Sequence, residues 1–278
     1  NSSCQKILLV AYFLSINWLP KNEGLKALMK VARIEKVDSD NVSFGIAPRI
    51  NASGRMADAT VAVKMLLAEN EMEAYKYAKV LDEQNTKRQE VEKGIYNEAI
   101  AQIERDGLDK KKTMVIAGEN WHQGVIGIVA SKLTEKYLKP VILLAHDGET
   151  AKGSGRIPAG ISLYDALSEC SDLLTTFGGH ELAAGLTLEA KNIEAFREKF
   201  EQVITSMKEE DFVRVIDIDT EITKKDITLN ILESIGVCSG KSVALPPHNI
   251  ITSILSVIDK ASSTWHTFTP FVCILTVE

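Results

Sequence analysis

Residues 113–145 read TMVIAGENWHQGVIGIVASKLTEKYLKPVILLA, and this stretch decides the fold class. Two short apolar runs, Thr113–Ala117 and Pro140–Ala145, are rich in Val, Ile and Leu and are bounded by turn residues, which indicates buried strands. Between them, the apolar residues of Gly124–Tyr137 recur at helical spacing. A strand, a helix and a strand form a βαβ unit, so we expect an α/β fold with a central sheet.

The sequence on either side of this unit predicts further elements. Apolar residues at helical spacing indicate a helix over Gly24–Ala32, and Asp58 fits the N-cap of the helix that follows it. Ser162 and Asp165 have the spacing of a capping box at the start of another helix. The remaining predicted elements are a strand and turn over Ile7–Leu19, strands over Gly185–Leu188 and Arg214–Asp219, and a helix over Ile193–Met207 capped by Asn192.

The longest uninterrupted helical pattern runs from Glu71 to Arg105. Apolar stripes mark its front and its rear, whereas Asp82–Glu90 is polar on every face. This arrangement is typical of a connector that buries its ends and bridges solvent in the middle. The alternative is two helices with a break near Gln84–Asn85. We favour one helix because neither Gly nor Pro occurs there.

The composition restricts how the chain could bind nucleic acid. Its 278 residues are 45% hydrophobic and 25% charged, as in a soluble globular chain of one large or two ordinary domains. The formal net charge of −6 opposes polyanion binding, so a nucleic-acid site would have to be a local cationic cleft. The cations that could form such a cleft are Arg49, Arg55, Lys152 and Arg156.

The cysteines and the N-terminal apolar run indicate the compartment. Cys4, Cys170, Cys238 and Cys273 lie far apart and have no metal-binding spacing, which is typical of buried thiols in a reducing environment. The run Ile7–Leu19 is too short to cross a bilayer, and no small-residue cleavage site follows it. We therefore expect a cytoplasmic protein that does not contact a membrane.

Two glycine-rich strings, Gly153–Arg156 and Phe177–Gly185, carry the strongest chemical signal. Glycine lets backbone N–H groups approach a ligand closely, and a phosphate oxygen accepts hydrogen bonds from Ser, Arg and His side chains. We expect His180 to open a short helix through Ala184, whose N-terminus would attract anions. The alternatives are a tight hairpin turn at the first string and a purely structural histidine at the second.

Arg49, Asn51 and Arg55 form a third candidate site. They follow Pro48, so we expect a loop or an interrupted helix there. The guanidinium fork suits phosphate, but residue type alone favours solvated or salt-bridged surface arginines.

The neighbours Trp121 and His122 form a fourth candidate site. His122 could point into a cleft from a loop. For Trp121 two interpretations stay open, stacking on a base of a single strand and packing in the core.

Four segments, in this order, resemble one known family. Phe44–Met56 with Asp58–Ala59 resembles the segment that joins the two halves of RecJ-type single-stranded-DNA exonucleases, and Trp121–Leu133 resembles the start of their DHHA1 domain. Both glycine strings resemble the same domain, which in the DHH phosphodiesterase superfamily holds the nucleic-acid backbone. The resemblance implies a DHH-domain remnant and interdomain segment over 1–70, a connector helix over 71–106, a DHHA1 domain over 107–220, and a diverged or partly disordered tail over 221–278, where the family has a β-rich barrel.

The resemblance also implies an activity and a partner. The parent protein would be a Mn²⁺- or Mg²⁺-dependent 5′→3′ exonuclease of DNA repair and recombination that acts on single-stranded DNA with a 5′-phosphate. Its oligomeric state does not follow from the sequence, and a monomer is favoured. Within this chain the implied phosphate- and nucleic-acid-binding residues are Arg49, Asn51 and Arg55 facing the DNA path, Ser154 and Arg156 gripping the 5′ end, Gly178, Gly179 and His180 near the scissile phosphate, and His122 in the cleft.

The metal-binding half of such an enzyme is not expected in this segment. No Asp-His-His sequence occurs, and the stretch similar to the family's last Asp ligand has Asn17, a poor ligand for a hard cation. We expect this chain to bind no metal, to supply no catalytic residue and to cleave nothing alone. Two rivals remain, another DHH phosphodiesterase acting on short oligonucleotides or cyclic dinucleotides, and a noncatalytic nucleic-acid-binding module.

Overall fold

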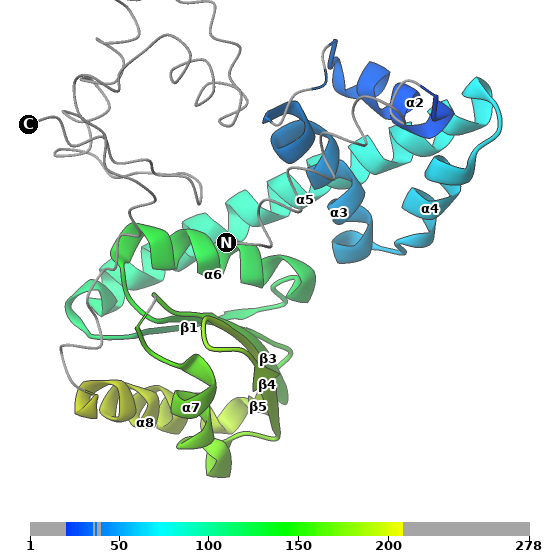
Figure 1. Cartoon of the computed structure of the whole chain (residues 1–278). Coiled ribbons are helices and arrows are strands. Elements are labelled where there is room, and N and C mark those ends of the chain that lie inside the picture. The colour runs from blue at the N-terminus through cyan, green and yellow to red at the C-terminus, as the bar shows by residue number, and fades with distance from the viewer. Residues whose placement is uncertain (1–20, 36, 38–39, 159, 208–278) are drawn as a thin grey trace, which may run out of the picture. The chain divides into compact units, whose positions relative to one another are not determined.

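A computed structural model describes residues 21–35, 37, 40–158 and 160–207 of the chain (Figure 1). The described residues belong to two compact units, one containing residues up to Thr86 and the other beginning at Lys87. The strands predicted over Ile7–Leu19 and Arg214–Asp219, and the predicted tail, lie outside the described residues.

The first unit is helical. Helix α2 (Glu23–Ala32) confirms the predicted helix, and the Asn22 side chain caps it by accepting a hydrogen bond from the Leu25 N–H. Leu28, Met65 and Leu81 are fully buried in the core of this unit. The remaining elements are η1 (Asn41–Ile46), a π-helix, α3 (Ala47–Met56), α4 (Thr60–Leu67) and the first half of α5 (Glu71–Asp106).

The structure corrects the sequence interpretation around Pro48. We expected a loop or an interrupted helix, but α3 is continuous over Ala47–Met56. Pro48 lies in the first turn, where its missing N–H costs no hydrogen bond. Asp58 was expected to be the N-cap of the next helix, but the N-cap of α4 is Ala59, one residue later. Asp58 Oδ1 still accepts hydrogen bonds from the N–H and the hydroxyl of Thr60.

Helix α5 is continuous over its 36 residues, so the predicted single helix is confirmed and a break at Gln84–Asn85 is excluded. Its middle differs from the solvated segment that we expected. Asn85 is 4% exposed, and the buried Glu92 carboxylate forms ion pairs with Arg88 and with Lys132. Polar residues therefore continue the buried face of α5 through its middle, where the sequence alone predicts exposure to solvent on every side.

The second unit contains a five-stranded mixed sheet. The strands are β1 (Met114–Glu119), β2 (Val141–His146), β3 (Thr150–Arg156), β4 (Thr176–Gly179) and β5 (Ala183–Glu189), in the order β1-β2-β3-β5-β4. Only β1 and β2 are parallel, and α6 (Gln123–Tyr137) connects them. The predicted βαβ unit is thus confirmed.

Helices cover the sheet on both faces (Figure 1). On one face α6 packs over β2 and β3. On the other, α7 (Leu163–Ser168) and α8 (Ile193–Ser206) enclose a core that includes Phe196 and Phe200. The Ser162 side chain caps α7 as predicted, whereas Asn192 at the N-cap of α8 makes no side-chain capping bond. Short 3₁₀ turns complete the unit at η2 (Leu108–Lys110), η3 (Ser171–Leu173) and η4 (Ala190–Asn192).

Cys170 lies in this core as a free thiol, and burial raises its pKa to about 11. This confirms the expected buried thiol at one position; the other three cysteines lie outside the described residues. Within the same described part of the chain, no helix is both long and apolar enough to cross a membrane.

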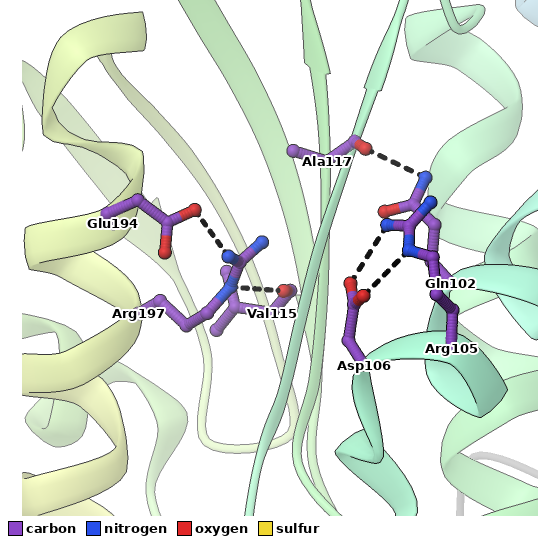
Figure 2. A network of polar contacts seen from close by, with 7 residues as sticks. All are labelled: Gln102, Arg105, Asp106, Val115, Ala117, Glu194 and Arg197. Atoms are coloured by element: carbon purple, nitrogen blue, oxygen red, sulfur yellow. Dashed lines mark hydrogen bonds and ion pairs between the residues drawn. The ribbon is translucent and has the colours of Figure 1, made fainter.

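Side chains from two helices cover the outer edge of β1 (Figure 2). Gln102 of α5 donates a hydrogen bond to the Ala117 carbonyl at 3.0 Å, and Arg197 Nε of α8 donates one to the Val115 carbonyl at 2.9 Å. An uncovered edge strand would leave such carbonyls available for pairing with another chain. Both helices are therefore fastened to the same strand.

Candidate nucleic-acid interface

Both glycine strings contribute to β-strands. Gly153–Arg156 is the end of β3, within the sheet, where we had considered a hairpin turn. The second string forms β4, a tight turn and the start of β5. His180 is in that turn and not at a helix N-terminus, because its N–H donates to the Ala183 carbonyl at 2.8 Å and closes the hairpin. Ala183 and Ala184, which we expected at the end of a short helix, are instead the first residues of β5.

Strand register places the polar residues of three strands in rows across the sheet. Ser154 is opposite Gly185, which is opposite Gly178. Two residues further back along β3, Lys152 is opposite Thr187, which is opposite Thr176. Side chains two residues apart share a face, so these rows line one surface.

The same surface continues toward the β4–β5 turn. Arg156 is opposite Ala183, and His180 occupies the hairpin position opposite Ala183. His180 is exposed, whereas Arg156 is partly buried. The structure thus brings Ser154, Arg156 and His180 to the same end of one sheet, with Ala183 of β5 between the arginine and the histidine.

A groove of about 440 Å³ lies over these rows, beside the first turn of α6. Its lining combines hydroxyls, an ammonium group and bare glycine backbone: Gln123, Ile126, Lys152, Gly153, Ser154, Thr176, Phe177, Gly178, Gly185, Leu186 and Thr187. Hydroxyl, ammonium and backbone N–H groups bind phosphate and sugar oxygens in proteins.

Arg156 and Ser154 form a preassembled pair. Arg156 Nη1 donates to Ser154 Oγ at 3.0 Å and to the Gly155 carbonyl at 2.7 Å. Gly127 of α6 lies against both side chains, and a Cβ there would be 2.9 Å from Ser154 Oγ and 3.1 Å from Arg156 Nη2. The pair is therefore held by the close approach of a helix, which fixes the directions of the hydroxyl and the guanidinium.

His122 is the N-cap of α6, and its Nδ1 accepts a hydrogen bond from the Gly124 N–H at 3.2 Å. In the neutral ring the proton is then on Nε2. Its neighbour Trp121 is 7% exposed, lies against Gly118 and donates from Nε1 to Glu98 at 2.7 Å. Core packing is therefore the correct interpretation of Trp121, and stacking on a base is wrong.

In the first unit, α3 separates the three candidate residues. Arg49 is 19% exposed, forms an ion pair with Asp82 at 2.7 Å and donates to the Gly45 carbonyl at 2.8 Å. Asn51 and Arg55 are exposed and lie one helical turn apart on the same face. Arg49 thus fastens α3 to α5, which is the salt-bridged alternative considered above.

Comparison with known proteins agrees with this geometry. The DHHA1 domain matches residues 110–206, the part of the chain that contains the sheet and the groove. The single-stranded-DNA-specific exonuclease RecJ of Bacillus subtilis is 38% identical over 234 residues, which are 82% of this chain and 30% of that protein. RecJ of Escherichia coli is 38% identical over 194 residues, or 66% of this chain and 33% of that protein.

A solved structure shows the same relationship. The crystal structure of RecJ in complex with Mg²⁺ from Thermus thermophilus matches 72% of this chain and 31% of its own, with a TM-score of 0.62 and 32% identity. The chain is thus similar to RecJ-type proteins over most of its length, and its residues 110–206 match the DHHA1 domain. It spans about a third of the length of the curated RecJ relatives named above.

This similarity bears on metal binding, because solved RecJ structures contain Mg²⁺ or Mn²⁺. In the part of this chain that the structure describes, no group of three or more His, Cys, Asp or Glu side chains could hold a metal ion. The described residues therefore do not fit the metal of RecJ-type proteins, and no step of the chemistry is assigned to a metal here.

Several groove residues were not among the predicted site residues. Thr176 and Thr187 belong to no motif, and Gln123 and Gly127 were not singled out within Trp121–Leu133. Strand register and helix packing place Gln123, Thr176 and Thr187 at the groove and Gly127 against Ser154 and Arg156. One signal was available: polar residues alternate with small ones along 150–156, the period of a strand with one polar face.

Proposed function

We propose that this chain is part of a single-stranded-DNA-specific 5′→3′ exonuclease, a phosphodiester hydrolase of DNA repair and recombination in the cytoplasm, and that it binds the DNA backbone and the 5′-phosphate. The observation that carries the proposal is the hydrogen-bonded Ser154–Arg156 pair. Gly127 lies against both side chains, and the adjoining groove is lined in part by glycine backbone. A terminal phosphate offers the acceptor oxygens that such a hydroxyl and guanidinium need.

Charge and backbone both support this assignment. The chain has a net charge of −6, so attraction of DNA must come from local cations, and Lys152 and Arg156 stand on the groove face. The first turn of α6 adds the positive end of its helix dipole. Neither contribution depends on base identity, which suits an enzyme that degrades any sequence.

Other residues receive supporting roles in the proposal. His180, with Gly178 and Gly179 before it, contacts the backbone near the scissile phosphate. Asn51 and Arg55 present a second polar surface to the strand. Cleavage requires metal ligands from the rest of a RecJ-type protein, with Mn²⁺ or Mg²⁺, and the 278-residue chain alone is inactive.

The test measures affinity of the 278-residue chain for a labelled single-stranded 12-mer with and without a 5′-phosphate, by fluorescence anisotropy. Wild type is expected to prefer the phosphorylated strand, and Arg156→Gln to lose about tenfold in that preference, the equivalent of a charge-assisted hydrogen bond. Arg105→Gln is the matched control, because this exposed guanidinium pairs with Asp106 at the end of α5.

Equal affinity of wild type for both strands would overturn the 5′-phosphate assignment. If Arg105→Gln loses as much preference for the phosphorylated strand as Arg156→Gln does, the effect comes from the change in net charge and not from a contact in the groove. Hydrolysis of the oligonucleotide by the purified chain in Mn²⁺ would contradict its proposed inactivity.

A further inference from the structure

The glycines around the groove are of two kinds. At Gly153, Gly155 and Gly179 an added Cβ would come within 2.6, 2.9 and 2.3 Å of neighbouring atoms, so the packing of the protein itself requires glycine. At Gly178 an added Cβ would meet nothing within 4 Å, and at Gly185 the nearest atom is 3.9 Å away. The fold therefore does not require glycine at these last two positions.

Glycine in a strand interior weakens the strand, by roughly 0.5–1 kcal/mol relative to Ala. Gly178 and Gly185 nevertheless lie side by side in one row with Ser154, on the exposed face of β4 and β5. Their missing side chains leave a flat backbone surface within the groove. Such a surface admits a ligand directly onto the sheet.

The next row on the same face is polar. It consists of Lys152, Thr187 and Thr176, all of which line the groove. Within the described part of the chain, the Lys152 ammonium has neither an ion pair nor a hydrogen bond. This row and the Ser154 row are two residues apart along the strand, which corresponds to a distance of about 6.7 Å. That is the scale of one sugar between two consecutive phosphates.

We propose that Lys152, Thr187 and Thr176 form a second phosphate subsite, which binds the phosphate next to the terminal one. The intervening sugar lies on the Gly178–Gly185 surface. This inference rests on the proposed function and extends it from the 5′ end to the first internucleotide linkage. Its ligand is thus the unit phosphate–sugar–phosphate of a nucleic-acid strand, and not an isolated phosphate.

The proposed phosphate-binding surface ends at the next row of the sheet. In the row beyond Lys152, Thr150 is opposite Glu189, whose carboxylate pairs with Lys191. Because Lys191 neutralises this carboxylate, the row offers no net positive charge to a third phosphate. The strand is therefore expected to leave the sheet after two phosphates.

The smallest probe is a pair of nucleotides, thymidine 5′-phosphate and thymidine 3′,5′-bisphosphate, titrated into the 278-residue chain by calorimetry. The second phosphate is expected to raise affinity about three- to fivefold, the range of an exposed charge pair. Lys152→Gln and Thr187→Val should abolish this gain, so that the bisphosphate binds no more tightly than the monophosphate. Arg156→Gln should weaken both nucleotides equally.

Lys110→Gln is the matched control, because Lys110 is an exposed lysine of the same unit that precedes β1, at the opposite edge of the sheet from β4. A second variant, Gly185→Ala, adds a methyl group that the protein can accommodate but that occupies the groove. It should melt at or above the wild-type temperature and bind the bisphosphate about tenfold more weakly.

The outcomes separate the two proposals. If Arg156→Gln weakens the monophosphate but Lys152→Gln keeps the gain from the second phosphate, the second subsite is wrong and the proposed function stands. Wild-type affinity in a correctly folded Gly185→Ala variant would also overturn the subsite. If wild type binds neither nucleotide, both proposals fail.

Discussion

At the scale of single residues, the site depends on where side chains are absent. Ser154 and Arg156 could be singled out from the sequence because hydroxyl and guanidinium groups between glycines suit phosphate. Gly127 could not, because nothing in a helical run of Val and Ile marks one glycine as the contact for a strand. Its role follows from tertiary packing, on which the local pattern carries no information.

Replacing Gly127 by Ala tests this contact. Ala favours a helix over Gly by about 1 kcal/mol, but the new Cβ must displace Ser154 Oγ or Arg156 Nη2. We expect a free energy of unfolding within about 1 kcal/mol of wild type and a roughly tenfold loss of preference for a 5′-phosphate.

Gly94→Ala in α5 is the control, since a Cβ there would meet nothing within 4 Å. It should gain up to about 1 kcal/mol in urea denaturation and leave DNA binding unchanged. Equal DNA binding by the two variants would show that Gly127 does not position the phosphate-binding pair.

At the scale of elements, the sequence predicted what depends on local periodicity. The βαβ unit and α5 follow from their apolar spacing, and the structure confirms both. The elements that were misread depend on distant partners. Ala183 and Ala184 were expected at the end of a short helix, yet pairing with β3 and β4 places them in a strand. In α3, Pro48 is compatible with a helix because the preceding π-helix places it in a first turn.

Near the edge of β1, one arginine is largely buried and another is exposed. Arg197 is 21% exposed and donates to the Val115 carbonyl, whereas Arg105 is 69% exposed and pairs with its neighbour Asp106 (Figure 2). Arg197→Met should therefore lower the free energy of unfolding by about 1.5–3 kcal/mol, because the carbonyl of a buried residue loses a charged donor.

Arg105→Met should stay within about 0.5 kcal/mol of wild type. Urea denaturation followed by far-UV circular dichroism measures both values. A similar loss in the two variants would mean that the Val115 hydrogen bond does not stabilise the sheet edge.

At the scale of the whole molecule, an acidic chain presents a small cationic surface on one sheet. The net charge of −6 excludes binding by a general positive field, and the polar face of β3, β5 and β4 supplies the local alternative. The match of the DHHA1 domain to residues 110–206 covers the same sheet. Sequence motifs could indicate the family, but only strand register reveals which groups stand next to each other.

The most direct test of the central claim is a crystal structure of the 278-residue chain with a 5′-phosphorylated trinucleotide. We expect the terminal phosphate within hydrogen-bonding distance of Ser154 Oγ and the Arg156 guanidinium, with the strand running across Gly185 toward Lys152. A trinucleotide bound on the face covered by α7 and α8, with no phosphate at Ser154, would contradict the account.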